Sequence, residues 1–297
     1  MKLLAKSVLR SSVVQHVTTG CFRGAGAVDV LVGKETTLEL LSRHGCDDGE
    51  GSMETVWQQA VGGTIMDMAT LPWNAALRAG GPEEVEGRDL LAVLSDSGKL
   101  TFLGFSTTLH RFVVVSHVSI DGEGFDARTR AQHLSVDGCG WAIAVASLRN
   151  RLLLLPACRQ FQGAGPLCMV ERDGAFYQGR DTLESSSSHG GVYASTEWGT
   201  IWSLAFVSND EHANTCAGAP LPPSLRLAAV VHRTGSACSE VQLLEWERNR
   251  GGICCLLRLS LPHEEQLGLL LRVVPVPQNP TAMVAIGSKA VMVLQLE

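Results

Sequence analysis

The amino-acid sequence predicts an all-β protein, a β-propeller of WD40-like four-stranded blades with about five blades present. Three observations favour this fold class: apolar strands recur in pairs, a tight polar turn joins each pair, and the segments between pairs lack helical periodicity. The paired pattern occurs five times, in units that begin at Val28, Arg88, Gly140, Leu225 and Thr281. We therefore expect five hairpins, each forming the middle of one blade.

The hairpin turns contain the residues that tight turns require. Examples are DSGK from Asp96 and GSK from Gly287, where glycine can supply a positive φ without a Cβ clash. The strands are almost continuously apolar, as in Leu90–Leu94, which is typical of strands buried on both faces. We therefore expect the sheets to stack against one another.

A four-stranded blade also needs an inner strand before each hairpin and an outer strand after it. The inner-strand candidates are Val13–Thr18, Thr64–Thr70, His133–Asp137, Thr200–Val207 and Leu269–Val274. The outer-strand candidates are Thr55–Ala60, Phe112–Val118, Leu167–Glu171 and Ile253–Leu259. The fifth unit has no outer candidate before the sequence stops at Glu297, so we expect an incomplete ring.

Two of the inner-strand candidates share a phrase. GTIMDMATLP from Gly63 and GTIWSLAFVS from Gly199 place an apolar residue and an alanine at equivalent positions, Met68-Ala69 and Leu204-Ala205. This self-similarity favours a repeat architecture.

The connecting segments predict loops, because glycine, proline, serine or acidic residues dominate them. They are Gly45–Ser52, Gly80–Gly87, Ser185–Gly191 and Ala217–Pro223. Only Arg128–His133 and Trp57–Ala60 could begin a turn of helix. A parallel α/β sheet would need helices between its strands, so this class is disfavoured.

We expect residues 1–12 to form an N-terminal extension and residues 13–297 a partial propeller domain. The extension has basic and hydroxyl residues, and no acidic residue precedes Asp29, which is the composition of an organelle transit peptide. The alternative is that Val13, Val14 and Val17 belong to a β-branched strand. Whether residues 1–12 are a targeting segment stays open.

Composition and charge exclude several classes of protein. Apolar residues make up 45% and charged residues 18% of the chain, which excludes a disordered polyelectrolyte. The net charge of −6 gives no overall positive field for nucleic acid. The nine cysteines are odd in number and form no C-x-x-C, so we expect thiols in a reducing compartment. No apolar segment has the length of a membrane helix.

The order of five segments resembles one known family. They are DVLVGKETTLELL, GTIMDMATLP followed by DLLAVLSDSGKLTFLGF, SVDGCGWAIAVASLRNRLLLLP, GTIWSLAFV and LLLRVVPVPQNPTAMVAIGSKAVMVL. From about Val13 to Leu294 the chain is similar to the N-terminal β-propeller of large subunits of nuclear complexes. The family comprises the cleavage and polyadenylation specificity factor A subunit, the large damaged-DNA-binding protein and the propeller subunit of splicing factor 3b.

The resemblance implies a nuclear scaffold of three seven-bladed propellers that docks protein partners and assists nucleic-acid recognition without catalysis. Family members are several times longer, and the loops around Glu83–Glu86, Gln162–Gly165 and Ser185–Ser188 do not match the family. The chain therefore resembles a fragment or a truncated relative, and functions of the later propellers do not carry over. The resemblance does not distinguish polyadenylation, splicing and DNA repair, nor does it say which rim loops bind a partner.

No nucleotide, hydrolase or metalloprotease motif occurs, so we predict no enzyme activity, no cofactor, no metal and no small-molecule substrate. Gly24-Ala25-Gly26 precedes a strand rather than the helix that a dinucleotide site needs. His44 with Cys46, and His212 with Cys216, offer two ligands each where a closed zinc site needs four. Cys254 and Cys255 should point to opposite faces of a strand, which disfavours a redox pair.

Asp67 on an inner strand and Asp96 in a turn are the carboxylates that an enzyme interpretation would use, but we assign both to structural roles. The tryptophans are expected to pack against apolar strands rather than stack on bases; they are Trp57, Trp73, Trp141, Trp198, Trp202 and Trp246. The arginine pairs are expected to be solvated loop residues; they are Arg149 with Arg151 and Arg248 with Arg250.

The sequence therefore predicts a noncatalytic, nuclear propeller scaffold that docks protein subunits, with partner-binding residues unknown. One alternative is a propeller enzyme with a carboxylate or histidine pair in the central channel. Another is a direct nucleic-acid binder, which the charge of −6 disfavours.

Overall fold

The computed structural model describes most of the chain from residue 13 to residue 295. The described ranges are 13–24, 26–44, 52–74, 77, 85–120, 131–147, 151–157, 192–195, 199–207, 224–233, 239–247, 252–260, 268–276 and 279–295. The predicted extension, residues 1–12, lies outside them. Nearly all regular structure in these ranges is β-strand, which confirms the all-β prediction.

The strands form five antiparallel sheets in chain order, and each sheet is one blade. Blade 1 is β1 (Val14–Gly20), β2 (Asp29–Lys34), β3 (Thr37–His44) and β4 (Ser52–Ala60). Blade 2 is β5 (Ile65–Leu71), β6 (Leu90–Ser95), β7 (Lys99–Ser106) and β8 (Arg111–Ser119). Blade 3 is β9 (Ala131–Val136), β10 (Ala142–Ser147), β11 (Arg151–Pro156) and β12 (Val192–Ser195). Blade 4 is β13 (Gly199–Val207), β14 (Ser224–Arg233), β15 (Ser239–Glu247) and β16 (Gly252–Ser260), and blade 5 is β17 (Leu270–Val276), β18 (Asn279–Gly287) and β19 (Val291–Gln295).

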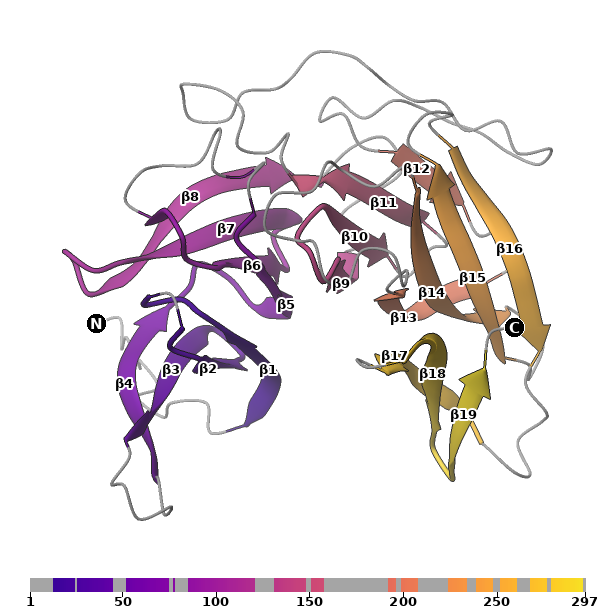
Figure 1. Ribbon diagram of the computed structural model, residues 1–297, viewed down its shortest axis with the longest axis horizontal. Coiled ribbons are helices and arrows are strands. Elements are labelled where there is room, and N and C mark those ends of the chain that lie inside the picture. The colour runs from indigo at the N-terminus through magenta and orange to yellow at the C-terminus, as the bar shows by residue number, and fades with distance from the viewer. Residues whose placement is uncertain are drawn as a thin grey trace, which may run out of the picture.

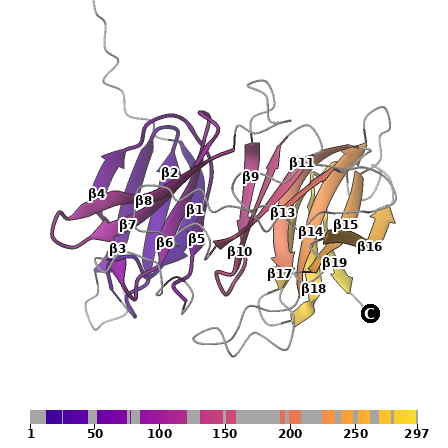
Figure 2. The same ribbon diagram turned by 90° about the horizontal axis from the view of Figure 1, so that it is seen from above.

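The five blades stand side by side in an arch, with the first strand of each blade toward the centre (Figure 1). The arch is open between blade 1 and blade 5. A view from above shows the sheets stacked one against the next (Figure 2). All five predicted hairpins and all five predicted inner strands are confirmed, with bounds that differ by at most three residues. The described residues thus form five blades of an incomplete β-propeller.

The prediction of the third outer strand was wrong. Leu167–Glu171 lies outside the described residues, and the strand that pairs with β11 is β12, with Arg151 opposite Ser195. This strand has only four residues, VYAS, and follows a serine-rich segment, so it lacks the apolar run by which the other strands are recognised. The other three predicted outer strands are confirmed as β4, β8 and β16.

The turn prediction is confirmed at Gly98, which has a φ of 72° in the β6–β7 turn. Gly287 has no positive φ and instead ends β18. Cys139 is disulfide-bonded, so the expectation of thiols is wrong at this position, whereas Cys21, Cys254 and Cys255 are not in disulfides.

One apolar cluster fills each space between neighbouring blades, because strands in the middle of a blade are apolar on both faces. In β6, Leu91 and Val93 pack toward blade 1, while Leu90, Ala92 and Leu94 pack toward blade 3. In β14, Leu227 and Ala229 pack toward blade 3, while Ala228 and Val230 pack toward blade 5. The period of two along these strands therefore joins blade 2 and blade 4 to both of their neighbours.

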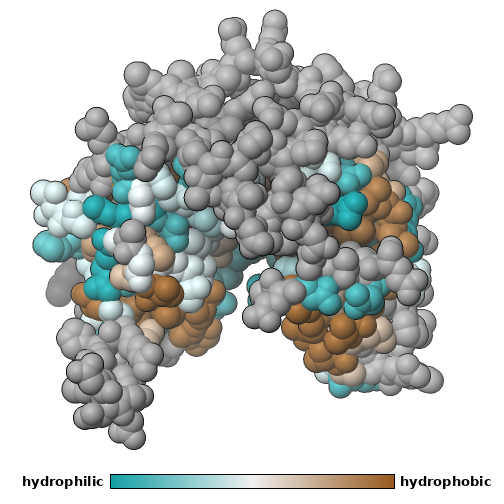
Figure 3. All heavy atoms as spheres, viewed as in Figure 1, coloured by the Kyte–Doolittle hydropathy of each residue, from teal (hydrophilic) through white to brown (hydrophobic). Residues whose placement is uncertain are grey.

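The two blades that border the opening carry apolar side chains that no described residue covers. On β19, Val291 is 63% and Val293 66% exposed, whereas Met292 and Leu294 face blade 4. On β1, Val17 is 60% exposed. Brown, hydrophobic surface lies on both sides of the opening in Figure 3. No helix of the described residues is long and apolar enough to span a membrane.

Candidate functional site

The centre of the arch is lined by the five inner strands, and each has an irregularity near its start. The pairing of each inner strand with its hairpin skips one residue, which forms a β-bulge. The bulged residues are Gln15, Met66, Gln132, Trp202 and Leu271. The residues that follow them are polar in every blade: His16, Asp67, His133, Ser203 and Arg272. A bulge redirects the side chains beside it, so the repeated bulge brings polar residues to the channel at the same level.

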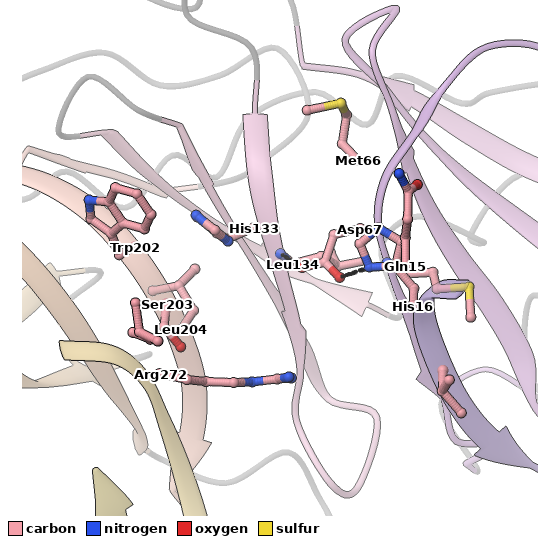
Figure 4. A pocket seen from close by; sticks show the side chains of 13 residues that line it. Gln15, His16, Met66, Asp67, His133, Leu134, Trp202, Ser203, Leu204 and Arg272 are labelled. Carbon is pink, nitrogen blue, oxygen red and sulfur yellow. Dashed lines mark hydrogen bonds and ion pairs between the residues drawn. The ribbon is translucent and has the colours of Figure 1, made fainter. Parts of the chain in front are cut away.

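These residues line a cavity of about 330 Å³ in the channel. Its walls come from all five inner strands and include most of the bulged and following residues (Figure 4). The cavity also contains Val17, Met68, Leu134 and Leu204. The lining is therefore mixed, and polar groups contribute most of its surface.

Asp67 is the carboxylate of this cavity, and backbone groups hold it in place. Its Oδ2 accepts a hydrogen bond from the backbone N–H of Leu134 at 2.8 Å, and its Oδ1 accepts one from the N–H of Met68 at 2.8 Å. His16 Nδ1 lies 3.4 Å from Oδ1. The bond to Leu134 crosses from blade 2 to blade 3, so Asp67 ties neighbouring inner strands together.

Similar bonds join the next blades. The Ser135 hydroxyl accepts a hydrogen bond from the N–H of Phe206 at 3.3 Å, and the Ser203 hydroxyl accepts one from the N–H of Val273 at 3.4 Å. Each bond connects an inner strand to the inner strand of the following blade. The side-chain oxygens of the channel thus satisfy backbone donors that the antiparallel pairing leaves free.

His133 projects into the cavity from β9 (Figure 4). Burial lowers the pKa of its imidazole below the ordinary value, the Arg272 charge lowers it further, and the Asp67 carboxylate opposes both effects. The His133 ring is therefore neutral at pH 7. It is a hydrogen-bonding group there, not a source of positive charge.

Trp202 and Arg272 form the side of the cavity that belongs to blades 4 and 5 (Figure 4). Trp202 is 42% exposed and meets the His232 ring edge to face, with centroids 5.3 Å apart. His232 Nε2 lies 2.9 Å from the carbonyl oxygen of Leu270, and Ser239 Oγ lies 2.9 Å from Nδ1. An imidazole that donates from Nε2 accepts at Nδ1, so the ring is fixed in orientation and holds Trp202 beside it.

The two carboxylates singled out from the sequence, Asp67 and Asp96, lie in different parts of the fold. Asp67 lies in the channel, whereas Asp96 lies in the β6–β7 turn and accepts a hydrogen bond from the N–H of Thr64 at 3.0 Å. Asp67 has a histidine neighbour, His16, that sequence reasoning did not pair with it. The channel carboxylate–histidine contact required by the enzyme alternative is thus present, although the described contacts use the carboxylate to hold backbone.

The tryptophans are divided between packing and exposure. Trp141 and Trp246 are buried in the cluster between blades 3 and 4, and Trp57 packs edge to face on Phe105 and Phe112. Trp73 packs against the cluster between blades 2 and 3. Trp202 departs from the packing prediction, because the bulge turns its ring toward the channel. Trp198 lies outside the described residues.

The remaining candidates do not assemble into a site. Gly24 and Gly26 lie in the loop between β1 and β2, and Cys254 and Cys255 lie on β16 and form no disulfide. His44 ends β3 and Arg151 begins β11, whereas Cys46, His212, Cys216, Arg149, Arg248 and Arg250 lie outside the described residues. Within the described ranges, no three histidine, cysteine or acidic side chains come close enough to hold a metal ion.

Sequence reasoning missed His16, His133 and Arg272 as members of one site. A signal was present in the two related phrases, where Asp67 and Ser203 occupy the same position after Gly-Thr-Ile. In the other blades this position has different residues and different flanking letters, so the sequence alone gives no alignment. The register skip at each bulge shows the equivalence.

The sheets and the channel define the class of protein: an open β-propeller whose inner strands are tied together by polar side chains. A family model described as the RSE1/DDB1/CPSF1 first β-propeller matches residues 13–217, which is more than half of the chain. The chain belongs to this family of propeller domains. It is also 24% identical over 152 residues to the pre-mRNA-splicing factor prp12 of Schizosaccharomyces pombe, and the match covers 51% of this chain and 12% of that relative.

Proposed function

We propose that the chain is a noncatalytic scaffold that docks protein subunits of a nuclear complex in pre-mRNA splicing. The observation that carries the proposal is family membership over residues 13–217, together with the similarity to a protein named as a pre-mRNA-splicing factor. That relative is much longer than the matched segment, so its role is transferred here as a proposal.

Two features of the structure support a docking role. Apolar clusters fill the space between every pair of neighbouring blades, which makes the arch a rigid support for surface groups. Asp67, the channel residue best suited to acid–base chemistry, accepts two backbone hydrogen bonds. Those bonds favour a structural role for the carboxylate over a role in turnover.

The experiment is affinity purification of the tagged, folded chain from nuclear extract of its own organism, followed by identification of proteins and RNA. We expect splicing-complex proteins to be recovered in stoichiometric amounts. Recovery of polyadenylation or DNA-repair subunits instead would keep the scaffold role and replace the complex. Failure to recover any subunit above a tag-only control would contradict the proposal.

Direct nucleic-acid binding is the competing function, and salt dependence separates it from protein docking. Phosphate contacts give a steep loss of affinity with increasing salt, whereas protein docking with few charge pairs gives a shallow one. Because the net charge is −6, we expect the recovery of subunits to depend only weakly on salt concentration, over a range of about 50 to 300 mM.

A further inference from the structure

The channel cavity contains a cation that the described residues leave without an acceptor. Arg272 lines the cavity, is exposed, and forms no ion pair or hydrogen bond within the described ranges. A guanidinium stays charged at all physiological pH values and presents five N–H donors in a planar fork. The group therefore has its full capacity to bind an oxyanion.

The carboxylate of the cavity is not available to Arg272 in this arrangement. Asp67 already contacts His16 and accepts the backbone hydrogen bonds of Leu134 and Met68. Figure 4 shows Asp67 and His16 together on the wall formed by blades 1 and 2, while Arg272 extends into the cavity from blade 5. The channel thus has one satisfied negative charge and one unsatisfied positive charge.

The surroundings of Arg272 favour a ligand that is only partly polar. The exposed ring of Trp202 comes from the adjacent inner strand, and Leu204 and Leu271 also line the cavity. A volume of about 330 Å³ lies at the lower end of the range for ligand pockets. It accommodates one acidic side chain with an apolar neighbour, not an extended polymer.

We propose that the channel binds a short acidic peptide segment of a partner protein, with a Glu or Asp carboxylate on Arg272 and an adjacent apolar side chain against Trp202. The pairing of a carboxylate with a guanidinium is bidentate and specific. This inference rests on the proposed docking function and names the chemistry of the partner. A nucleic acid fits less well, because a run of phosphates requires several cations and the chain carries a net charge of −6.

The test is selection of random 12-residue peptides displayed on phage against the intact chain, followed by affinity measurement for the most enriched peptide. We expect enrichment of an acidic residue beside an apolar one. We expect Arg272→Gln to weaken binding of that peptide about 10-fold or more, the loss typical of a hydrogen bond to a charged group. Arg272→Lys keeps the charge but not the planar fork of donors. Its affinity for the peptide should lie between those of the unsubstituted protein and Arg272→Gln.

The matched control is Arg111→Gln, because Arg111 is an exposed arginine on the outer strand β8. It should change the affinity less than about twofold, as expected for a surface charge outside the site. Circular dichroism and thermal unfolding verify that both variants are folded. A decauridylate RNA and inorganic sulfate are measured in parallel on all proteins.

Three results of the peptide experiment would overturn the inference: no enriched peptide, enriched peptides without an acidic residue, or peptide binding that Arg272→Gln leaves unchanged. RNA binding that depends on Arg272, in the absence of peptide binding, would assign the channel to nucleic acid instead. If Arg272→Gln still recovers the nuclear subunits, the channel inference fails while the scaffold function stands. If peptide binds through Arg272 but no nuclear subunit is recovered, the scaffold function fails instead.

Discussion

Acidic side chains of this propeller accept hydrogen bonds from backbone groups that are distant in sequence. Asp89 Oδ2 accepts from the N–H of Cys21 at 2.7 Å, and its Oδ1 accepts from the N–H of Trp73 at 3.0 Å. Asp67 does the same for Leu134 across the next pair of blades. A carboxylate offers several lone pairs, so one acidic residue satisfies donors on two segments at once.

Asp29 provides a test of such a residue. It is fully buried, and its Oδ1 accepts hydrogen bonds from Arg23 Nε at 2.9 Å and Nη2 at 2.6 Å. We expect Asp29→Asn to lower the free energy of unfolding by roughly 3 kcal/mol, since it leaves the partly buried Arg23 guanidinium without its counter-charge. Urea denaturation measures the effect. Glu35→Gln, at an exposed turn residue, is the control and should change stability by less than about 0.5 kcal/mol.

Two histidines make the free energy of unfolding depend on pH. Burial lowers the pKa of both His133 and His232 below the ordinary value. At His133 the Asp67 charge opposes this shift and the Arg272 charge adds to it. At His232 the hydrogen bond to the Leu270 carbonyl opposes it. The unfolded chain therefore binds more protons than the folded chain just below pH 6.5. The two histidines contribute their full stabilisation above the pKa that they have in the unfolded chain. This stabilisation is lost as the pH falls through their lower pKa in the folded chain.

We expect the urea midpoint to fall between pH 7.5 and pH 5.5, and to fall less in the double variant His133→Gln and His232→Gln. Parallel urea titrations at the two pH values measure this difference. An equal decrease in the unsubstituted and the double-variant proteins would assign the pH dependence to other groups.

At the scale of elements, tight turns fix how one blade docks on the next. Asn74, after β5, donates from Nδ2 to the carbonyl oxygens of Cys139 and Gly140 in the β9–β10 turn, at 3.0 and 2.9 Å. This close approach is allowed because Gly140 has a φ of 72° and no Cβ. A Cβ there would lie 2.5 Å from the carbonyl oxygen of Pro72.

Gly140→Ala is therefore expected to destabilise the protein by about 2 kcal/mol or more, because it combines backbone strain with a backbone clash. The matched control is Gly138→Ala in the same turn, where a Cβ meets nothing within 4 Å and φ is not positive. Thermal unfolding of both variants provides the comparison. Equal stabilities of the two variants would contradict the role of the Gly140 contact.

At the scale of the whole molecule, the arch leaves one face of blade 5 uncovered by the described residues. Val291 and Val293 form an exposed apolar row on β19, and Leu271 and Val274 of β17 are also exposed. Contiguous exposed apolar surface marks sites of protein–protein association or aggregation. The exposed side of blade 5 therefore favours association with another protein surface.

We expect the purified chain to self-associate with increasing concentration, and Val291→Thr with Val293→Thr to reduce this association. Threonine keeps the β-branched shape that suits a strand and removes apolar surface. Light scattering over a concentration series measures the self-association. The control is Val114→Thr, because Val114 on β8 is about as exposed as the two valines of β19. A monodisperse monomer of the unsubstituted chain at high concentration would contradict the expectation.

The sequence by itself determined the strands and their order, because the hairpins, turns and two-faced apolar runs are local patterns. Leu90–Leu94 predicted burial on both faces, and the structure confirms it. The sequence did not determine β12, since VYAS has too few apolar residues to be distinguished from the loop before it.

Only the tertiary structure decided the channel. His16, Asp67, His133, Ser203 and Arg272 are separated by tens of residues and share no motif, so no spacing rule connects them. They meet because each inner strand inserts one extra residue against its hairpin and the five blades turn these positions toward one axis. Bulge positions depend on how a strand pairs with its neighbour, and that pairing is absent from the order of the letters.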